Sequence, residues 1–409
     1  MSRFSVLPRS VASIVVLTIT ALLLASCQQN AFQVDGSSAG RNGRLATDPG
    51  QAAPLRPLSA EVNGEKVGTG PVRVAMILPK TASGAAGIAG SELANAAKMA
   101  MRDFAGNRFQ LVIKDTKGQP AEASILAAQA RDEGASLVLG PLFSANVSSA
   151  SGVTEPAKIP MIAFSSDIAR ARPGVYLLSF APDADIRRTL SYGYSLGANR
   201  VVALLPESSY GRLAERELRR TYDRLGAEIV TIIRYKRNSD EIVSAARSAV
   251  LPLANANAIY IPEGGRVPAL ILDTLKKSGI DLTSKQIMGS GQWTSTSSRD
   301  SVLNGAIYAG ADKTGFTQFA TRYKTLHGNE PSITAALGYD AISLASELLR
   351  RSPQSPFTAS QIQSRGGFRG ATGIFRFEAD GRLQRALVVN RIDAGQPIIV
   401  SPAPSSFGR

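Results

Sequence analysis

The side chains with the clearest capacity for ligand chemistry lie in one strand–helix–strand unit, residues 137–167. Its first strand, Leu137–Leu139, is an apolar run without alternation, which is typical of a strand buried on both faces of a parallel sheet. The polar residues that follow the two strands of the unit are Ser144, Ser165, Ser166 and Asp167. Open α/β sheets bind ligands at the carboxyl ends of their strands. We therefore interpret this unit as one wall of a ligand cleft.

Loops after other predicted strands add further candidates, namely Ser83, Tyr210 and Trp293. Serine hydroxyls can donate or accept hydrogen bonds, and helix N-termini beyond such loops present free N–H groups to an anion. The two aromatic rings can cover an apolar or cationic part of a ligand. Each single serine has an alternative role as a helix cap or turn residue. Their recurrence in several loops favours binding.

The elements that must position these loops alternate between strand and helix. The predicted strands are 72–79, 109–114, 137–139, 160–164, 176–180, 201–205, 228–235, 258–261 and 286–288. The predicted helices outside the opening unit are 91–104, 121–132, 185–196, 212–225, 240–249 and 267–277. This order predicts right-handed crossovers and parallel sheets. Two consecutive runs of such units predict two lobes instead of one very wide sheet.

The pattern changes after residue 307. Two helices, 315–326 and 333–351, precede a pair of strands, 373–378 and 383–392, which Asp380-Gly381 joins. That dipeptide predicts a hairpin with a type I′ turn. The two helices have no sheet of their own, so we expect them to return to the first lobe.

Catalysis and metal binding have little support in the residue types. His327 is the only histidine and Cys27 the only cysteine, so a histidine metal site and a thiol cluster are excluded and no cofactor is expected. His327 is followed by Gly328, where a cation would stabilise the end of a helix. Asp167, Glu207 and Glu263 could act as general acids and bases or could bind an amine. Their spacing along the chain does not distinguish these two roles. We expect a protein that is not an enzyme, and the alternative is a serine hydrolase.

Residues 1–27 have the pattern of an export signal. Arg3 and Arg9 precede an apolar segment of 14 residues, 11–24, which is too short to span a bilayer permanently. The segment ends in Leu24-Ala25-Ser26-Cys27, which resembles the bacterial lipobox, in which the cysteine is lipidated. The alternative is an unlipidated signal peptide. Because Gln28 and not Asp follows the cysteine, the resemblance favours the outer membrane over the inner one.

Residues 28–70 are rich in Gly, Ser, Ala and Pro and show no apolar periodicity. Such a composition is too poor in large apolar side chains to offset ordering entropy, so we expect a flexible tether. As a coil it would reach roughly 35 Å.

The chain is basic, with 46 Lys and Arg against 32 Asp and Glu and a formal charge of +14. Nucleic-acid binding would require concentrated charge with interleaved aromatic residues, whereas the charge here is scattered. We expect a solvated basic surface and no nucleic-acid partner. An anionic lipid or an envelope polyanion is the alternative partner.

The folded part resembles the type 1 periplasmic ligand-binding proteins of the leucine/isoleucine/valine-binding kind, the substrate-binding components of ABC transporters. The resemblance covers residues 72–392 and depends on the order of four segments. They are VRVAMILPKTASG, GPLFSANVSSASGVTEPAKIPMIAFSSD, ALLPESSYGRLAERELRRTYDRLGAEIV and GATGIFRFEADGRLQRALVV. It implies an α/β fold in two lobes, each a mostly parallel sheet flanked by helices. It places the first lobe at 71–180 plus 310–370 and the second at 181–309 plus 371–405.

The resemblance also implies roles for individual residues. In amino-acid-binding members, the loops that match Phe143-Ser144 and Phe164–Asp167 hold the ligand's carboxylate and amine, and Tyr210 matches an aromatic residue of the second lobe. Asp167 stands where those members have threonine, and its charge would repel a ligand carboxylate. Gln292 stands about where an acidic residue would meet the amine. The expected ligand is therefore an amino acid or an amide-like molecule.

A lipid anchor, a tether and an altered pocket are also similar to the penicillin-binding protein activator lipoproteins. That branch implies a role in cell-wall synthesis through contact with a penicillin-binding protein, in place of delivery to an ABC permease. Both alternatives place the protein in the periplasm, attached to the cell envelope through Cys27.

Overall fold

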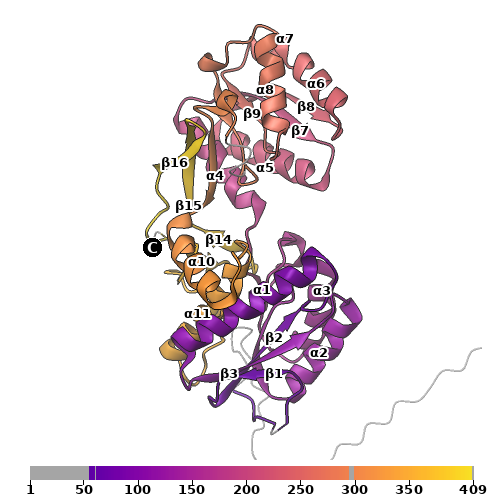
Figure 1. The fold of residues 1–409 in the computed structure, drawn as a ribbon, viewed down its shortest axis with the longest axis vertical. Helices are drawn as coiled ribbons and strands as arrows, with labels where there is room; N and C mark the ends of the chain where they lie inside the picture. Colours follow the sequence, from indigo (N-terminus) through magenta and orange to yellow (C-terminus); the bar gives the residue numbers. More distant parts are fainter. Residues whose placement is uncertain (1–54, 60, 294–298, 408–409) are drawn as a thin grey trace, which may run out of the picture. The chain divides into compact units, whose positions relative to one another are not determined.

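The computed structural model describes residues 55–59, 61–293 and 299–407, which form two main sheets and one small sheet (Figure 1). The first has the order β1-β3-β2-β4-β5-β6 and is parallel except for β1, which pairs antiparallel with β3. Its strands are β1 (Glu65–Val67), β2 (Val72–Leu78), β3 (Phe109–Asp115), β4 (Ala135–Leu139), β5 (Met161–Ala163) and β6 (Val175–Leu177).

The second sheet has the order β16-β15-β11-β10-β9-β7-β8. Its strands are β7 (Arg200–Pro206), β8 (Glu228–Tyr235), β9 (Ala258–Tyr260), β10 (Gln286–Met288), β11 (Ile307–Ala311), β15 (Leu387–Asp393) and β16 (Gln396–Ser401). Strands β15 and β16 are antiparallel to their neighbours, and the other pairs are parallel. The small third sheet contains β12 (Phe368–Gly370), β13 (Gly373–Phe377) and β14 (Leu383–Arg385).

Helices connect these strands. Those that precede β7 are α1 (Ala85–Ala100), which continues as the π-helical turn η1 (Met101–Ala105), α2 (Pro120–Asp132), α3 (Ser144–Thr154), the short η2 (Ile168–Arg170) and α4 (Pro182–Ser195). The later ones are α5 (Ser209–Leu225), α6 (Ser239–Ser248), α7 (Val250–Leu253), α8 (Val267–Lys277), η3 (Leu282–Ser284), η4 (Ser301–Leu303), α10 (Lys313–His327), α11 (Ala335–Arg351) and α12 (Ala359–Ile362). Among the described residues, no helix has the length and apolarity that a membrane span requires.

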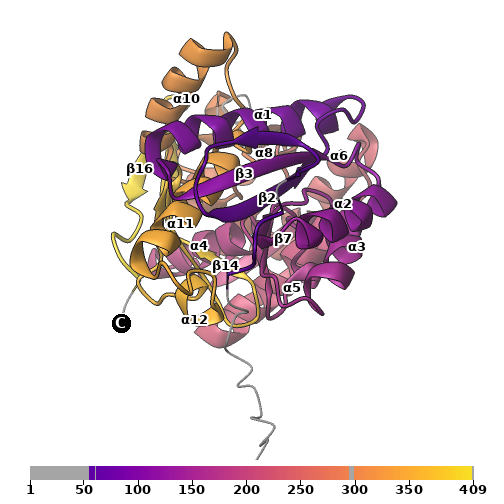
Figure 2. The same cartoon turned by 90° about the horizontal axis from the view of Figure 1, so that it is seen from below.

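Strand β2 shows how the sequence builds the first lobe. Every residue from Val72 to Leu78 is buried, and successive side chains point to opposite faces of the sheet. Val74 and Met76 pack in the core that contains α1 and α11, which lie side by side in Figure 1. Ala75 and Ile77 pack on the other face, in the core that contains α2 and α3. Figure 2 shows β2 and β3 with these helices around them.

The second lobe repeats this arrangement around β7. Val202 and Leu204 pack with α6 and α8 on one face of the sheet, and Val201 and Ala203 pack with α4 and α5 on the other. Two sheets with separate cores, each covered by helices on both faces, confirm the predicted two-lobed α/β fold.

The segment before residue 70 is more ordered than the sequence predicts. We expected a tether over residues 28–70, but β1 forms three residue pairs with β3, and Glu65 forms ion pairs with Lys80 and Lys98 at 3.0 and 2.9 Å. An edge strand pairs through its backbone groups and needs no apolar periodicity. The tether was predicted because residues 28–70 lack that periodicity. The predicted tether is therefore too long at its C-terminal end.

The boundaries between the two lobes along the chain differ from the predicted ones. The predicted boundary at 370/371 assigned the last hairpin to the second lobe, but Phe375, Phe377 and Leu383 belong to the core of the first lobe. The predicted strand 383–392 is divided in two, since β14 pairs with β13 in the small sheet and β15 pairs with β11 in the second sheet. The change of sheet occurs at Ala386. The predicted boundary at 309/310 also falls within β11, whose whole length pairs with β15.

The hairpin β13–β14 is confirmed, but its turn is not of type I′. That turn requires positive φ at both central residues, and only Gly381 has it (φ 81°) while Asp380 does not. The Glu378 N–H donates to the Arg382 carbonyl at 2.8 Å, and the Gly381 N–H donates to the Glu378 carbonyl at 3.0 Å. These bonds define a longer loop that ends in a left-handed glycine.

Candidate ligand-binding site

Ser144 and Asp167 are brought together at the carboxyl ends of two neighbouring strands. Strand β4 ends at Leu139 and the parallel β5 ends at Ala163, and the loops after them carry the two residues. The Ser144 hydroxyl donates to the Asp167 carboxylate, with 2.5 Å between Oγ and Oδ2. The predicted convergence of these loops is thus present in the structure.

Two further donors surround the Asp167 carboxylate. The Ala169 N–H donates to its Oδ1 at 3.1 Å, which makes Asp167 the N-cap of η2, and the Arg170 Nε donates to Oδ2 at 3.2 Å. The Ser144 hydrogen bond is the main cause that lowers the pKa of Asp167, with Ala169 and Arg170 acting in the same direction against burial. Asp167 is therefore an anion at neutral pH, and its charge is balanced within its own lobe.

A tight backbone approach positions the first of these loops. Gly140 follows β4 with φ of 82°, and a Cβ there would lie 2.3 Å from the Ile77 carbonyl oxygen of β2. Only glycine combines this backbone conformation with this contact. The chain can therefore turn directly from β4 towards α3, and Ser144 becomes the first residue of that helix.

The other predicted serines of the first lobe lie at the same end of the sheet with different exposure. Ser83 is exposed in the loop between β2 and α1, and Ser166 is exposed next to Asp167. Ser165 is only 4% exposed, and its Oγ accepts a hydrogen bond from the Asp167 N–H at 3.2 Å. Ser165 supports the loop, whereas Ser83 and Ser166 are open to a ligand.

Tyr210 organises the corresponding end of the second sheet. It is the second residue of α5, and its hydroxyl donates to Ser290 Oγ at 2.8 Å. Ser290 donates in turn to the Pro262 carbonyl at 2.5 Å, so the loops after β7, β9 and β10 are joined. Burial is the main cause that raises the pKa of Tyr210, with the charges of Asp185 and Glu263 adding to it. The phenol is therefore a neutral hydrogen-bond donor.

Gln292 and Trp293 differ in their surroundings. Gln292 is exposed, and its backbone N–H donates to Ser290 Oγ at 3.1 Å. Trp293 is 2% exposed, packs in the core of the second lobe, and donates from Nε1 to the Ile261 carbonyl at 3.1 Å. In this conformation the indole supports the loop, and the Gln292 amide is the group that a ligand can reach.

Glu263 is buried next to this group and has partners of its own. The Tyr235 hydroxyl donates to its Oε2 at 2.7 Å, and the Arg237 Nε lies 2.5 Å from its Oε1. Both carboxylate oxygens are therefore engaged. Glu263 is therefore part of a structural ion pair. The two roles predicted for it, acid–base work and holding an amine, both require a carboxylate that is not already paired.

Two residues of these groups were not predicted, Arg170 and Ser290. Arg170 follows Asp167 by three residues, a spacing that brings oppositely charged side chains together on one helical turn. That signal was available in the sequence. Ser290 reaches the Pro262 carbonyl because β9 and β10 are neighbours in the sheet, and the sequence alone does not show which strands are neighbours.

His327 and the carboxylates offer little for catalysis or metal binding. Burial, followed by the charges of Lys98 and Arg102, lowers the pKa of His327. The expected role as a cation at the end of α10 is thus weakened at neutral pH, although Gly328 ends the helix as predicted (φ 79°). Within the part of the chain that the structure describes, no three His, Cys, Asp or Glu side chains are grouped to hold a metal. Cys27 lies outside the described residues.

Two lobes with polar loops at the carboxyl ends of their strands define a class of ligand-binding proteins, and comparison with known proteins agrees. The profile described as periplasmic binding protein matches residues 71–397. The chain therefore belongs to the periplasmic binding protein family. No curated protein sequence matches it at a significant level.

Solved structures share the fold at low sequence identity. A leucine-binding protein LivK of Thermotoga maritima is 22% identical, with 81% of this chain and 98% of that chain covered and a TM-score of 0.55. A putative branched-chain amino acid ABC transporter protein of Rhodospirillum rubrum is 18% identical, with 80% and 99% covered and a TM-score of 0.69. A solute-binding protein of an R. palustris ABC transporter, in complex with benzoate, is 17% identical, with 82% and 97% covered and a TM-score of 0.55.

Proposed function

We propose that this protein binds a small polar ligand between its two lobes and presents it to an ABC-type uptake system. One observation carries the proposal: Ser144, Ser166 and Asp167 lie together at the ends of two paired parallel strands. Ligands of open α/β sheets bind at this position. Membership of the periplasmic binding protein family supports the same role.

The charge of this group decides the ligand class that we propose. Asp167 is ionised and already holds the Ser144 hydroxyl, so a second carboxylate at this point would meet a like charge. An amine or an amide meets acceptor atoms instead. We infer that the ligand is an amino-acid-like or amide-like molecule that presents a donor group to Asp167. Ser83, Ser166 and Gln292 are the exposed polar groups that would complete its hydrogen bonds. Tyr210 lies in the second lobe with Gln292, since both bond to Ser290.

We further propose that the mature protein is a lipoprotein of the cell envelope, anchored through Cys27, and that the outer membrane is its location. The support is the Leu24-Ala25-Ser26-Cys27 motif and the residue Gln28 that follows. A Cys27→Ala variant should lose incorporation of a labelled fatty acid and appear in the soluble periplasmic fraction. Unchanged membrane association would contradict the anchor.

A second candidate function is regulation of cell-wall synthesis by contact with a penicillin-binding protein. The observation that favours it is the mutual satisfaction of Ser144, Asp167 and Arg170, which leaves fewer free groups for a ligand. In this case the cleft would bind no transported solute.

Thermal unfolding of the full-length protein separates the two candidates. A panel of amino acids, their amides and aromatic carboxylates is added one compound at a time. A ligand at 100 times its dissociation constant adds about 2.7 kcal/mol to the free energy of unfolding and raises Tm. If no compound raises Tm while a purified penicillin-binding protein is bound, the transport function is contradicted.

A further inference from the structure

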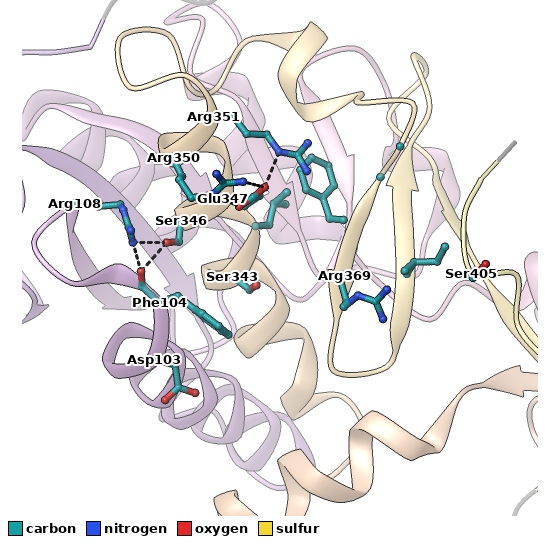
Figure 3. A pocket seen from close by; sticks show the side chains of 15 residues that line it. Asp103, Phe104, Arg108, Ser343, Ser346, Glu347, Arg350, Arg351, Arg369 and Ser405 are labelled. Atoms are coloured by element: carbon teal, nitrogen blue, oxygen red, sulfur yellow. Dashed lines mark hydrogen bonds and ion pairs between the residues drawn. The ribbon is translucent and has the colours of Figure 1, made fainter. Parts of the chain in front are cut away.

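A basic pocket lies in the first lobe, at the end of the sheet opposite to the candidate ligand-binding loops. Its volume is about 550 Å³, and its walls come from η1, from the last turns of α11 and from β12 (Figure 3). Arg108 lines it and directly precedes Phe109, the first residue of β3, whose other end lies near the ligand-binding loops. We call this site the basic pocket. It shares no residue with the candidate ligand-binding site.

Four arginines and two carboxylates line the basic pocket, a net charge of four minus two, or +2. The arginines are Arg108, Arg350, Arg351 and Arg369, and the carboxylates are Asp103 and Glu347. Asp103 is already engaged from outside the lining, by Arg322 at 2.8 Å and by the Tyr339 hydroxyl at 2.7 Å. The lining arginines therefore share one carboxylate.

That carboxylate, Glu347, serves two of the four guanidinium groups. Its Oε1 lies 2.7 Å from Nη2 of Arg350 and 2.7 Å from Nε of Arg351. The hydrogen bond from Arg350 is the main cause that lowers the pKa of Glu347, to about 2, so Glu347 stays ionised. One negative charge thus offsets two positive ones on this wall.

The other two arginines have no acidic partner among the described residues. Arg108 donates through Nη1 to the Phe104 carbonyl and to Ser346 Oγ, both neutral acceptors, and its Nε and Nη2 have no partner there. The Arg369 side chain is exposed on β12 and has no hydrogen-bond or ion-pair partner among the described residues. Each of these two guanidinium groups therefore has paired N–H donors that are available to a ligand.

Stabilisation of a helix end explains the presence of only two of the four arginines. Arg350 and Arg351 are in the last turn of α11, where cations interact favourably with the helix dipole. Arg108 and Arg369 are on other segments, so the dipole does not explain them. Phe368 also lines the pocket, and the Arg351 guanidinium group lies over its ring with 5.3 Å to the centroid. A fixed guanidinium group loses less freedom when it binds an anion.

We propose that the basic pocket binds phosphate groups, with Arg108 and Arg369 as the ligand-contacting residues. Guanidinium groups bind phosphate through paired N–H donors, and a doubly charged phosphate suits the charge excess better than a single carboxylate. The pocket is large enough for two or more linked phosphates. The phosphates belong either to a free oligophosphate or to a lipid headgroup, which share this chemistry.

Titration calorimetry of the full-length protein with pyrophosphate tests the proposal. Arg108→Gln and Arg369→Gln should each weaken pyrophosphate binding by tenfold or more, and Arg369→Lys should recover only part of it because lysine lacks the fork. Arg220→Gln is the matched control, since Arg220 is an exposed arginine of α5 in the other lobe, and it should change affinity by less than twofold.

Vesicles separate the two sources of phosphate. If the lipid headgroup is the source, binding to phosphatidylglycerol vesicles should exceed binding to phosphatidylcholine vesicles, and both pocket variants should remove the difference. If free oligophosphate is the source, only pyrophosphate binding should respond to the variants. The proposal is overturned if neither probe binds, if Arg220→Gln weakens binding as much as the pocket variants do, or if polyglutamate binds the pocket and pyrophosphate does not.

Discussion

The Ser144 hydroxyl lies 2.5 Å from the Asp167 carboxylate, so the first lobe supplies its own anion at the point where a ligand is expected. The two residues come from loops 23 positions apart along the chain. They meet because β4 and β5 are adjacent and parallel. We propose that Asp167 presents a carboxylate to the ligand although Arg170 pairs with it, and that this side chain sets the ligand preference.

Replacing Asp167 by threonine should shift ligand preference towards carboxylates. The change removes one negative charge and introduces a hydroxyl that can donate to a carboxylate. We expect the ratio of leucine to leucinamide affinity to rise about tenfold, which corresponds to about 1.4 kcal/mol. Calorimetry with both compounds measures the ratio. Asp132→Asn, an exposed change at the end of α2, is the control. An equal ratio in the wild type and in Asp167→Thr would remove Asp167 from the ligand's surroundings.

Ser144→Ala should raise the pKa of Asp167, because the Ser144 hydrogen bond is the largest cause that lowers it. A carboxyl with a lowered folded-state pKa stabilises the fold above its unfolded pKa of about 3.9 and loses that contribution as the pH falls through the folded value. The difference in Tm between wild type and Ser144→Ala should therefore be largest at neutral pH and should shrink as the pH falls through the lowered pKa of Asp167. A difference that is constant with pH would mean that the hydroxyl does not interact with the charge.

Tyr210→Phe should weaken ligand binding through the second lobe. The variant removes the hydroxyl that joins α5 to Ser290 and costs about 1 kcal/mol of stability. Tyr222→Phe is a matched control on the same helix, because its hydroxyl donates to the Ala198 carbonyl at 2.9 Å and is buried. Both variants should lower Tm, and only Tyr210→Phe should lower ligand affinity. Equal affinities would assign Tyr210 a structural role alone.

The sequence predicted most of the fold because its strands are apolar and its helices amphipathic. It missed β1, β12 and β16, which lie at sheet edges, where backbone pairing needs no apolar pattern. It also missed β11, which lies inside the second sheet between β10 and β15. It also read β14 and β15 as one strand, since only Ala386 separates them.

The sequence predicted which loops form the candidate site, but not which of their side chains face a ligand. The serines and Asp167 follow strands that end at one edge, and this follows from strand order. The burial of Trp293 depends on contact between the loops after β9 and β10, and the pairing of Glu263 with Arg237 depends on contact between the loops after β8 and β9. Residue type alone cannot distinguish a ligand-facing indole from a core indole.

Asp340 and Arg385 form a buried pair next to the point where the chain leaves the first lobe. Asp340 Oδ2 lies 4.0 Å from Arg385 Nη1, and both side chains are almost fully buried. Burial raises the pKa of Asp340 to about 6, although the Arg385 charge and the Ala371 N–H act in the opposite direction. The carboxyl is therefore harder to ionise in the folded protein than in the unfolded chain.

The sign of the resulting pH dependence follows from this raised pKa. Between about pH 4 and pH 6 the folded state holds a proton that the unfolded state releases, so Asp340 contributes stability at low pH that is lost as the pH rises through 6. The loss is on the order of 3 kcal/mol. Asp340→Asn has no such loss, so its stability relative to wild type should increase from pH 4 to pH 7. Denaturant unfolding at both pH values measures this change, and a relative stability that falls with rising pH would show that the ion pair with Arg385 outweighs the desolvation of the carboxylate.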